Sequence, residues 1–342
     1  MPRQYPPIWF DRLVQEWMGR FARAGAMMQL VEVGDNNNRV AKNRRKTVNF
    51  TKVRFCTIAL GLMLSTNFVP VIANADEGHA TLGEDAKDLP IFDAHMHYKE
   101  PAWDKYSVKN IIELMDHSGV AMGLVSSTPD EGTIMLWEYA PDRIVPELRP
   151  YHGDVGSSNW TKAQNMESYL EARLEKYPHQ GIGEFHIHNL DTADAPLFKN
   201  VIAMAKARDI SLHVHSGAEP VRWLYGLDAD VKIIWAHAGL GEPASEVYAL
   251  MKDFPGLYAD TSLRESSILP FSGEIDPEWK KIIFEFQDRL MVGSDTWVNS
   301  QWDNYGSIIA SNRNWLSRLP REVAEKIAYK NAEKLFDRKI GK

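Results

Sequence analysis

The chain lacks the features that define several large classes of protein. Its single cysteine, Cys56, lies in a segment that we expect to be removed, so the remaining chain has no thiol for disulfides, thiolate catalysis or zinc–thiolate sites. No G-x-G-x-x-G follows the first predicted strand and no G-x-x-x-x-G-K occurs, so nothing supports a dinucleotide site or a P-loop. With 25% charged and 44% hydrophobic residues, the chain is neither disordered nor a polytopic membrane protein.

Positive charge is scarce beyond the amino-terminal segment. The formal charge of −7 divides unevenly: residues 1–75 hold 11 Lys and Arg against 4 Asp and Glu, which leaves 28 against 42, or −14, for residues 76–342. An acidic body of this kind repels nucleic acid and anionic membranes. We therefore expect no nucleic-acid partner, and no membrane partner once the amino-terminal segment is gone.

The amino-terminal segment has the three parts of a secretory signal peptide. A basic flank at residues 42–46 precedes an apolar run without charge at residues 55–72, and the small residues Ala73-Asn74-Ala75 follow directly. The alternative is a transmembrane anchor, since about 20 apolar residues span a bilayer. Polar residues near the end of the run and the small-residue exit favour cleavage.

This pattern divides the chain into three parts. We interpret residues 1–41 as a poorly structured lead-in, which a start codon assigned too far upstream would explain, and residues 42–75 as the signal peptide. Residues 76–342 are then a single domain located in the periplasm or secreted.

Strand-like and helical patterns alternate from residue 88 onward, as in repeated strand–helix units around a parallel sheet. Eight strands are predicted, at residues 89–95, 120–126, 144–149, 182–187, 210–215, 231–236, 257–260 and 290–294. Helices are predicted at residues 108–117, 162–176, 196–208, 243–252, 277–288 and 321–336. The order and size predict an α/β fold, the (β/α)₈ TIM barrel, with a doubly wound open sheet as the structural rival.

Side chains of metal-binding types stand at the carboxyl ends of five predicted strands. They are Asp93, His95, His97, Glu184, His186, His188, His213, His215, His237 and Asp295. In a parallel barrel these ends converge on one face, and residues i and i+2 of a strand point the same way, so His95 and His97 can reach one cation together. Burying so many titratable groups is costly without a cation or a tight network. Imidazole and carboxylate without thiolate suit zinc, iron, manganese or cobalt.

The same segments resemble the amidohydrolase superfamily, closest to its amidohydrolase-2 branch of TIM-barrel metal-dependent hydrolases. The resemblance spans about residues 90–337 and rests on Asp93-Ala-His95-Met-His97, His215-Ser-Gly217, His237-Ala-Gly239, Gly293-Ser294-Asp295 and Asn331-Ala-Glu-Lys-Leu335-Phe336. It implies that His95, His97, His215 and Asp295 hold a divalent metal, with zinc favoured over manganese, iron or cobalt. It also implies that Asp295 carries the proton of the attacking water, and that His237 joins a metal or polarises the substrate.

The end of the fourth predicted strand departs from part of that superfamily. No lysine stands there, so a carbamylated lysine between two metals is not available. Glu184 takes that place, in a Gly181-Ile-Gly-Glu184 segment that resembles TatD-like hydrolases. Glu184 can support a second metal, orient the substrate or form a salt bridge, so one or two ions are expected. His213 is expected to support a ligand rather than to be one, and His186 and His188 are surplus to a single site.

The favoured function is hydrolysis, by metal-activated water, of a lactone, amide or ester carbon in a small, carboxylate-bearing molecule. Arg149, Arg222 and Arg264 each follow a predicted strand and are candidates for binding the substrate carboxylate. Trp297 is a candidate floor for a planar ligand. The alternatives are a metal-dependent decarboxylase of the same family and a non-catalytic metal- or partner-binding protein. A homo-oligomer is compatible with all three.

The signal-peptide hypothesis makes a prediction about the native protein. Because cleavage is expected after Ala75, the exported chain should begin near Asp76. Amino-terminal sequencing of the protein from its own host checks this, and a first residue upstream of Phe55 would contradict it.

Overall fold

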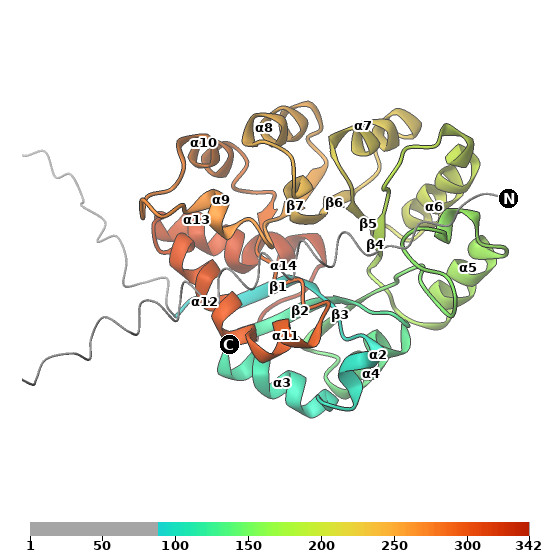
Figure 1. The fold of residues 1–342 in the computed structure, drawn as a ribbon, viewed down its shortest axis with the longest axis horizontal. Coiled ribbons are helices and arrows are strands. Elements are labelled where there is room, and N and C mark those ends of the chain that lie inside the picture. The colour runs from blue at the N-terminus through green and yellow to red at the C-terminus, as the bar shows by residue number, and fades with distance from the viewer. Residues whose placement is uncertain (1–87, 342) are drawn as a thin grey trace, which may run out of the picture. The chain divides into compact units, whose positions relative to one another are not determined.

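Parallel strands alternate with helices throughout the part of the chain that the computed structural model describes, residues 88–341 (Figure 1). The expected lead-in and signal peptide lie outside these residues. The strands are β1 Ile91–Met96, β2 Val120–Ser126, β3 Ile144–Glu147, β4 Gly181–His186, β5 Ser211–His215, β6 Ile233–Trp235, β7 Leu257–Asp260 and β8 Leu290–Met291. The prediction of eight strands is confirmed, although several are shorter than predicted. Most strand residues are buried, which explains why these segments consist of nearly continuous apolar runs.

The strands pair in chain order and in parallel. One sheet has the order β1-β2-β3 and the other the order β4-β5-β6-β7-β8. A parallel bridge between Leu148 and Ile182 joins the end of β3 to β4. The amide of Ala94 in β1 donates to the carbonyl of Val292, just after β8, at 2.9 Å. Main-chain hydrogen bonds therefore link each strand to the next and the last strand to the first.

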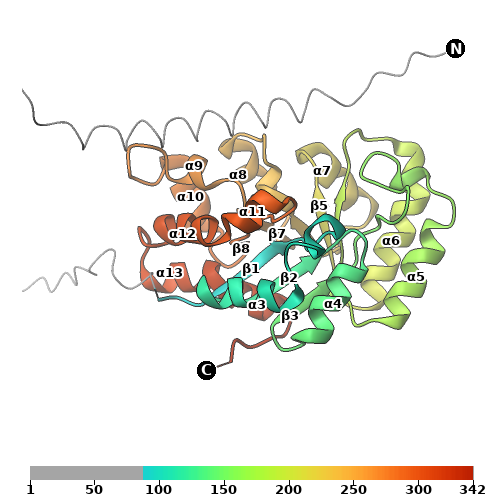
Figure 2. The same cartoon turned by 60° about the horizontal axis from the view of Figure 1, so that its bottom comes forward.

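Helices lie outside the strands, and the colours of Figures 1 and 2 follow the chain around them. Their bounds are α2 Glu100–Trp103, α3 Val108–His117, α4 Glu131–Tyr139, α5 Met166–Lys176, α6 Ala195–Ala207, α7 Ala218–Leu227, α8 Ala244–Asp253, α9 Glu265–Ile268, α10 Pro277–Glu285, α11 Asn299–Asp303, α12 Tyr305–Leu316, α13 Arg321–Glu325 and α14 Asn331–Leu335. No helix within residues 88–341 combines the length and apolarity needed to cross a bilayer.

Most helix predictions are confirmed, although several ends are shifted. Helix α3 has the predicted bounds, and the Ser107 hydroxyl accepts the Asn110 amide as an N-terminal cap. The segment predicted as one helix at residues 321–336 is helical from Arg321 to Leu335, with a π-helical turn at Lys326–Lys330 between α13 and α14. Just after the turn, the Asn331 side-chain amide donates to the carbonyl of Gln287, which follows α10, and to that of Leu290 in β8.

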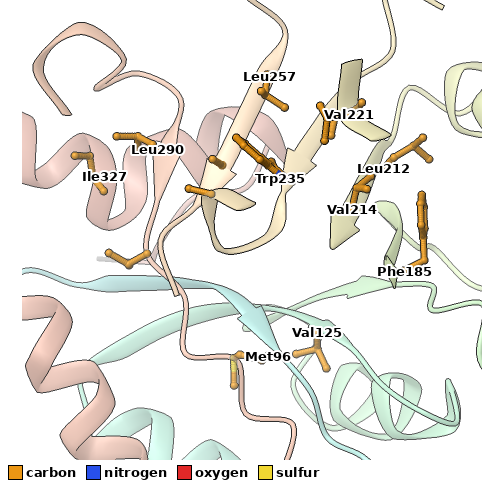
Figure 3. Close-up of a cluster of buried hydrophobic side chains, with 14 of the residues drawn as sticks. Met96, Val125, Phe185, Leu212, Val214, Val221, Trp235, Leu257, Leu290 and Ile327 are labelled. Carbon is orange, nitrogen blue, oxygen red and sulfur yellow. The ribbon is translucent and has the colours of Figure 1, made fainter. Parts of the chain in front are cut away.

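Two apolar clusters cover the two faces of the strands. The larger one packs strand residues against the surrounding helices, and Figure 3 shows Val214, Trp235 and Leu257 among its members. The smaller one comprises Phe92, Ala94, Met122, Leu124, Val145, Ile234, Met291, Ala332 and Phe336. Phe336 stacks on Phe92 with ring centroids 5.7 Å apart, so the carboxyl-terminal segment packs against β1. The carboxyl ends of the strands are therefore left for polar side chains.

Gly132 in α4 is a close-packing point that supports the segment after β1. A Cβ at this position would lie 2.1 Å from the carbonyl oxygen of Tyr98 and 3.1 Å from the Cβ of Ser127. Gly132→Ala should therefore lower the free energy of unfolding by about 1–3 kcal/mol. Gly226→Ala is the matched control, because exposed Gly226 lies in α7 with open space around its Cβ position, and there alanine should be neutral or stabilising. Denaturant unfolding measures both, and equal stability of the two variants would contradict the packing argument.

Candidate metal centre

Six of the predicted site residues come together at the carboxyl ends of the strands. They are His95, His97, Glu184, His215, His237 and Asp295, from β1, β4, β5 and the segments after β1, β6 and β8. Five of them are almost fully buried, and His215 is partly exposed. The expected convergence of strand ends thus brings imidazoles and carboxylates into one cluster.

His95, His97 and Asp295 form the first group of converging atoms. The Nε2 atoms of His95 and His97 lie 3.1 Å apart. Asp295 Oδ1 lies 3.6 Å from the first and 3.3 Å from the second. Ligand atoms around a tetrahedral zinc ion at about 2.0–2.2 Å are separated by roughly 3.3–3.6 Å, so these three atoms have the spacing of three ligands of one ion.

Glu184 connects this group to a second one. Its Oε2 lies 3.3 Å from His97 Nε2, while its Oε1 lies 2.6 Å from His215 Nδ1 and 3.4 Å from His237 Nε2. His215 Nδ1 and His237 Nε2 are themselves 3.2 Å apart. The resemblance implied that His215 shares an ion with His95 and His97, whereas the structure places it beside Glu184 and His237, since β4, β5 and β6 are neighbours.

The imidazoles are oriented for metal binding by partners on their far nitrogens. His97 Nδ1 is bonded to the Ser126 carbonyl, and His95 Nδ1 lies 3.2 Å from Asp260 Oδ2. Such partners fix the tautomer and turn the other nitrogen toward the cluster. Imidazole nitrogens and carboxylate oxygens at these spacings fit one or two divalent cations, and Glu184 is placed to bridge two.

Asp260, the last residue of β7, is a buried carboxylate that the sequence-based prediction missed. Its Oδ2 lies 3.2 Å from His213 Nε2, and the opposite nitrogen of His213 lies 3.0 Å from Glu147 Oε2. Burial opposes protonation of His213, but Glu147 and Asp260 raise its pKa to about 9. Burial opposes ionisation of Asp260, yet His95 and His213 hold its pKa well below the usual range.

His213 therefore lies between two carboxylates, one of which, Asp260, also contacts His95, and its role as support for a ligand stays a prediction. A sequence signal for Asp260 and Glu147 did exist. Each is a carboxylate that follows apolar residues of a short buried strand.

The catalytic candidates Asp295 and His237 have an unusual backbone conformation, and hydrogen bonds hold their main chain in place. Asp295 and His237 adopt positive φ values, 50° and 56°, which cost a non-glycine residue about 1–3 kcal/mol and cluster at functional sites. The Asp295 amide donates to the His95 carbonyl at 2.8 Å. Arg264 Nε donates to the His237 carbonyl at 3.0 Å.

The three arginines predicted to bind substrate are committed to protein partners. Arg149 Nη2 lies 2.6 Å from Glu184 Oε2, and its Nε donates to the Glu184 carbonyl. Arg264 donates to three main-chain carbonyls, and Arg222 pairs with carboxylates of α8 away from the cluster. These arginines therefore satisfy carbonyls and carboxylates of the protein, and their assignment to the substrate carboxylate stays a prediction. Trp297, by contrast, lies two residues from Asp295 and is partly exposed.

His186 forms an extension of the cluster beyond His215. The two rings stack with centroids 4.1 Å apart, and His186 Nδ1 lies 2.9 Å from the Tyr151 hydroxyl. Burial lowers the pKa of His186 to about 2, so this imidazole is neutral. His188 lies next to it and is exposed.

The chain is similar to known proteins in sequence and in fold. A family model described as amidohydrolase matches residues 163–338. No curated protein is a significant match to the sequence.

Solved structures of similar fold cover most of the chain. One is a probable 2-pyrone-4,6-dicarboxylic acid hydrolase from Acinetobacter baumannii with citric acid bound (TM-score 0.53, 15% identity, covering 73% of this chain and 100% of that chain). Others are a lactonase from Listeria monocytogenes (0.53, 14%, 75% and 97%) and a TatD homolog from Escherichia coli (0.51, 13%, 72% and 98%). At these identities the similarity concerns the fold.

The cluster predicts that divalent metal co-purifies with the protein and depends on His95. Replacing His95 by alanine removes a ligand atom from the first group, so bound metal should fall to a small fraction of the wild-type content. His117→Ala is the control, since His117 is exposed on α3, where its Nδ1 contacts the carbonyl of Glu113. Elemental analysis of the purified variants measures the metal. Equal metal in both variants would contradict the assignment.

Proposed function

The chain belongs to the amidohydrolase family and is a hydrolytic enzyme, and on that basis we propose that it cleaves a cyclic ester, amide or ester of a small molecule with a divalent metal held by His95, His97, Asp295 and Glu184. Zinc is the ion proposed first, since it favours imidazole nitrogens and carboxylate oxygens as ligands. We also propose that the eight linked strands form one (β/α)₈ barrel, and that the enzyme works outside the cytoplasm.

One observation carries the proposal. Four side chains from β1, β4 and the segment after β8 place their ligand atoms within a few ångströms of one another, at the strand ends where barrel enzymes have their active sites. Buried carboxylates and imidazoles that converge in this way are costly to a protein unless an ion or a network compensates them.

The metal, when bound, acidifies water and polarises a substrate carbonyl. The chain supplies the remaining chemistry. Asp295 Oδ2 accepts the proton of the attacking water and returns it to the leaving group. His237 Nε2 lies 4.0 Å from that oxygen, so His237 lines the position of the substrate oxygen on which charge develops. The Ser262 hydroxyl, 2.8 Å from His237 Nδ1, holds the ring in this orientation.

A cyclic ester is the first substrate class to test. Among the structures of similar fold are a lactonase and a probable 2-pyrone-4,6-dicarboxylic acid hydrolase. These names support a lactone as the starting point without deciding the substrate of this enzyme, and a panel of lactones, esters, amides and aromatic acids covers the proposed chemistry and the decarboxylase alternative.

Asp295→Asn tests the proposed mechanism on whichever substrate of the panel turns over. Asparagine keeps a neutral oxygen of nearly the same shape but cannot accept a proton. Because general acid–base catalysis contributes about 10²–10⁴-fold, kcat should fall by that factor while the fold persists. Asp303→Asn is the control, since Asp303 is exposed on α11 and pairs with Lys105.

Two results would contradict the proposal. A kcat for Asp295→Asn within a few-fold of the wild type at full metal occupancy would move the proton-transfer role to another residue. Release of carbon dioxide from an aromatic acid, with no hydrolysis anywhere in the panel, would make the enzyme a lyase.

A further inference from the structure

Lys99 is a partly buried cation near the candidate metal centre. It stands two residues after His97, immediately before α2, and its Nζ lies 5.7 Å from the ring centroid of Trp297. Trp297 in turn stands two residues after Asp295. The lysine and the tryptophan thus extend from the two segments, after β1 and after β8, that carry His97 and Asp295.

The backbone around Lys99 is held firmly on both sides. The Tyr98 amide donates to the Ser127 hydroxyl at 3.0 Å, and the Glu100 amide donates to the Thr128 carbonyl at 3.2 Å. Farther along, the Asn299 side chain donates to the Pro101 carbonyl, which ties the segment after β8 to α2. The position of the lysine relative to the metal centre is therefore fixed by the fold.

The ammonium group itself has no anionic partner among the carboxylates of residues 88–341. Neither an ion pair nor a hydrogen bond joins Lys99 Nζ to any of them, although Asp295 and Glu184 are near enough to act on its charge. By contrast, Arg149, Arg222 and Arg264 are all engaged by the protein.

We infer that Lys99 and Trp297 bind a carboxylate of the substrate, with the ammonium taking the charge and the indole face packing against the group that carries it. An ammonium is a compact point charge that can pair with a carboxylate oxygen, and a planar group that bears the carboxylate can pack against the indole face. The inference rests on the proposed function in one respect, namely that the metal centre receives the substrate. It assigns to Lys99 the specificity for a carboxylate that the strand-end arginines had been expected to provide.

Equilibrium binding of two probes to the metal-loaded enzyme tests the inference without any turnover. Benzoate and benzamide have nearly the same shape but differ in charge. The wild type should bind benzoate more tightly, and Lys99→Met should weaken benzoate binding by about 10-fold or more, the loss expected for a charged hydrogen bond. Benzamide binding should change by less than about two-fold, and Lys99→Arg should keep most of the preference for benzoate.

Lys105→Met is the matched control, because Lys105 is an exposed lysine just after α2 that pairs with Asp303. It should bind both probes as the wild type does. Metal content and thermal unfolding of each variant show that the fold and the centre are intact, and Lys99→Gln replaces Lys99→Met if the latter does not fold.

A wild type that does not distinguish the probes, or a Lys99→Met enzyme that keeps the preference, would overturn the inference. The proposed hydrolase function is judged separately, by turnover of the substrate panel. The two failures are therefore distinguishable.

Discussion

The carboxylate of Glu184 is the group on which the arrangement of the centre depends. It is buried, one oxygen faces His97 and the other faces His215 and His237, and Arg149 pairs with it from behind. An unpaired carboxylate in such a place would be strongly unfavourable. The arginine compensates its charge in the protein alone, and the proposed cation would compensate the charge of Asp295.

A second layer of charges keeps the first one ordered. Asp260 touches His95 and His213 from one side, and Glu147 touches His213 from the other. This chain of alternating charges lies beneath the metal ligands, where strands β3, β5 and β7 end. It explains how His213 can be buried at the heart of the site.

The strands could be predicted from the sequence because parallel strands buried on both faces leave short apolar runs between polar ends. The metal-binding pairs followed from their spacing and from the convergence of strand ends. Helix α4 was missed because much of it is buried, so it shows no clear apolar stripe. The partners of the arginines and of Lys99 could not be predicted from the sequence. Whether such a cation pairs with a carbonyl, with a carboxylate or with no group of the protein depends on contacts between segments far apart in the chain.

The central claim is that His95, His97 and Asp295 coordinate one ion. Anomalous diffraction from crystals of the purified enzyme, recorded at the absorption edge of the metal that co-purifies, tests it most directly. The account predicts a peak about 2.0–2.2 Å from the Nε2 atoms of both histidines and from Oδ1 of the aspartate. A metal-loaded crystal with its anomalous peaks elsewhere, and none between these three atoms, would contradict it.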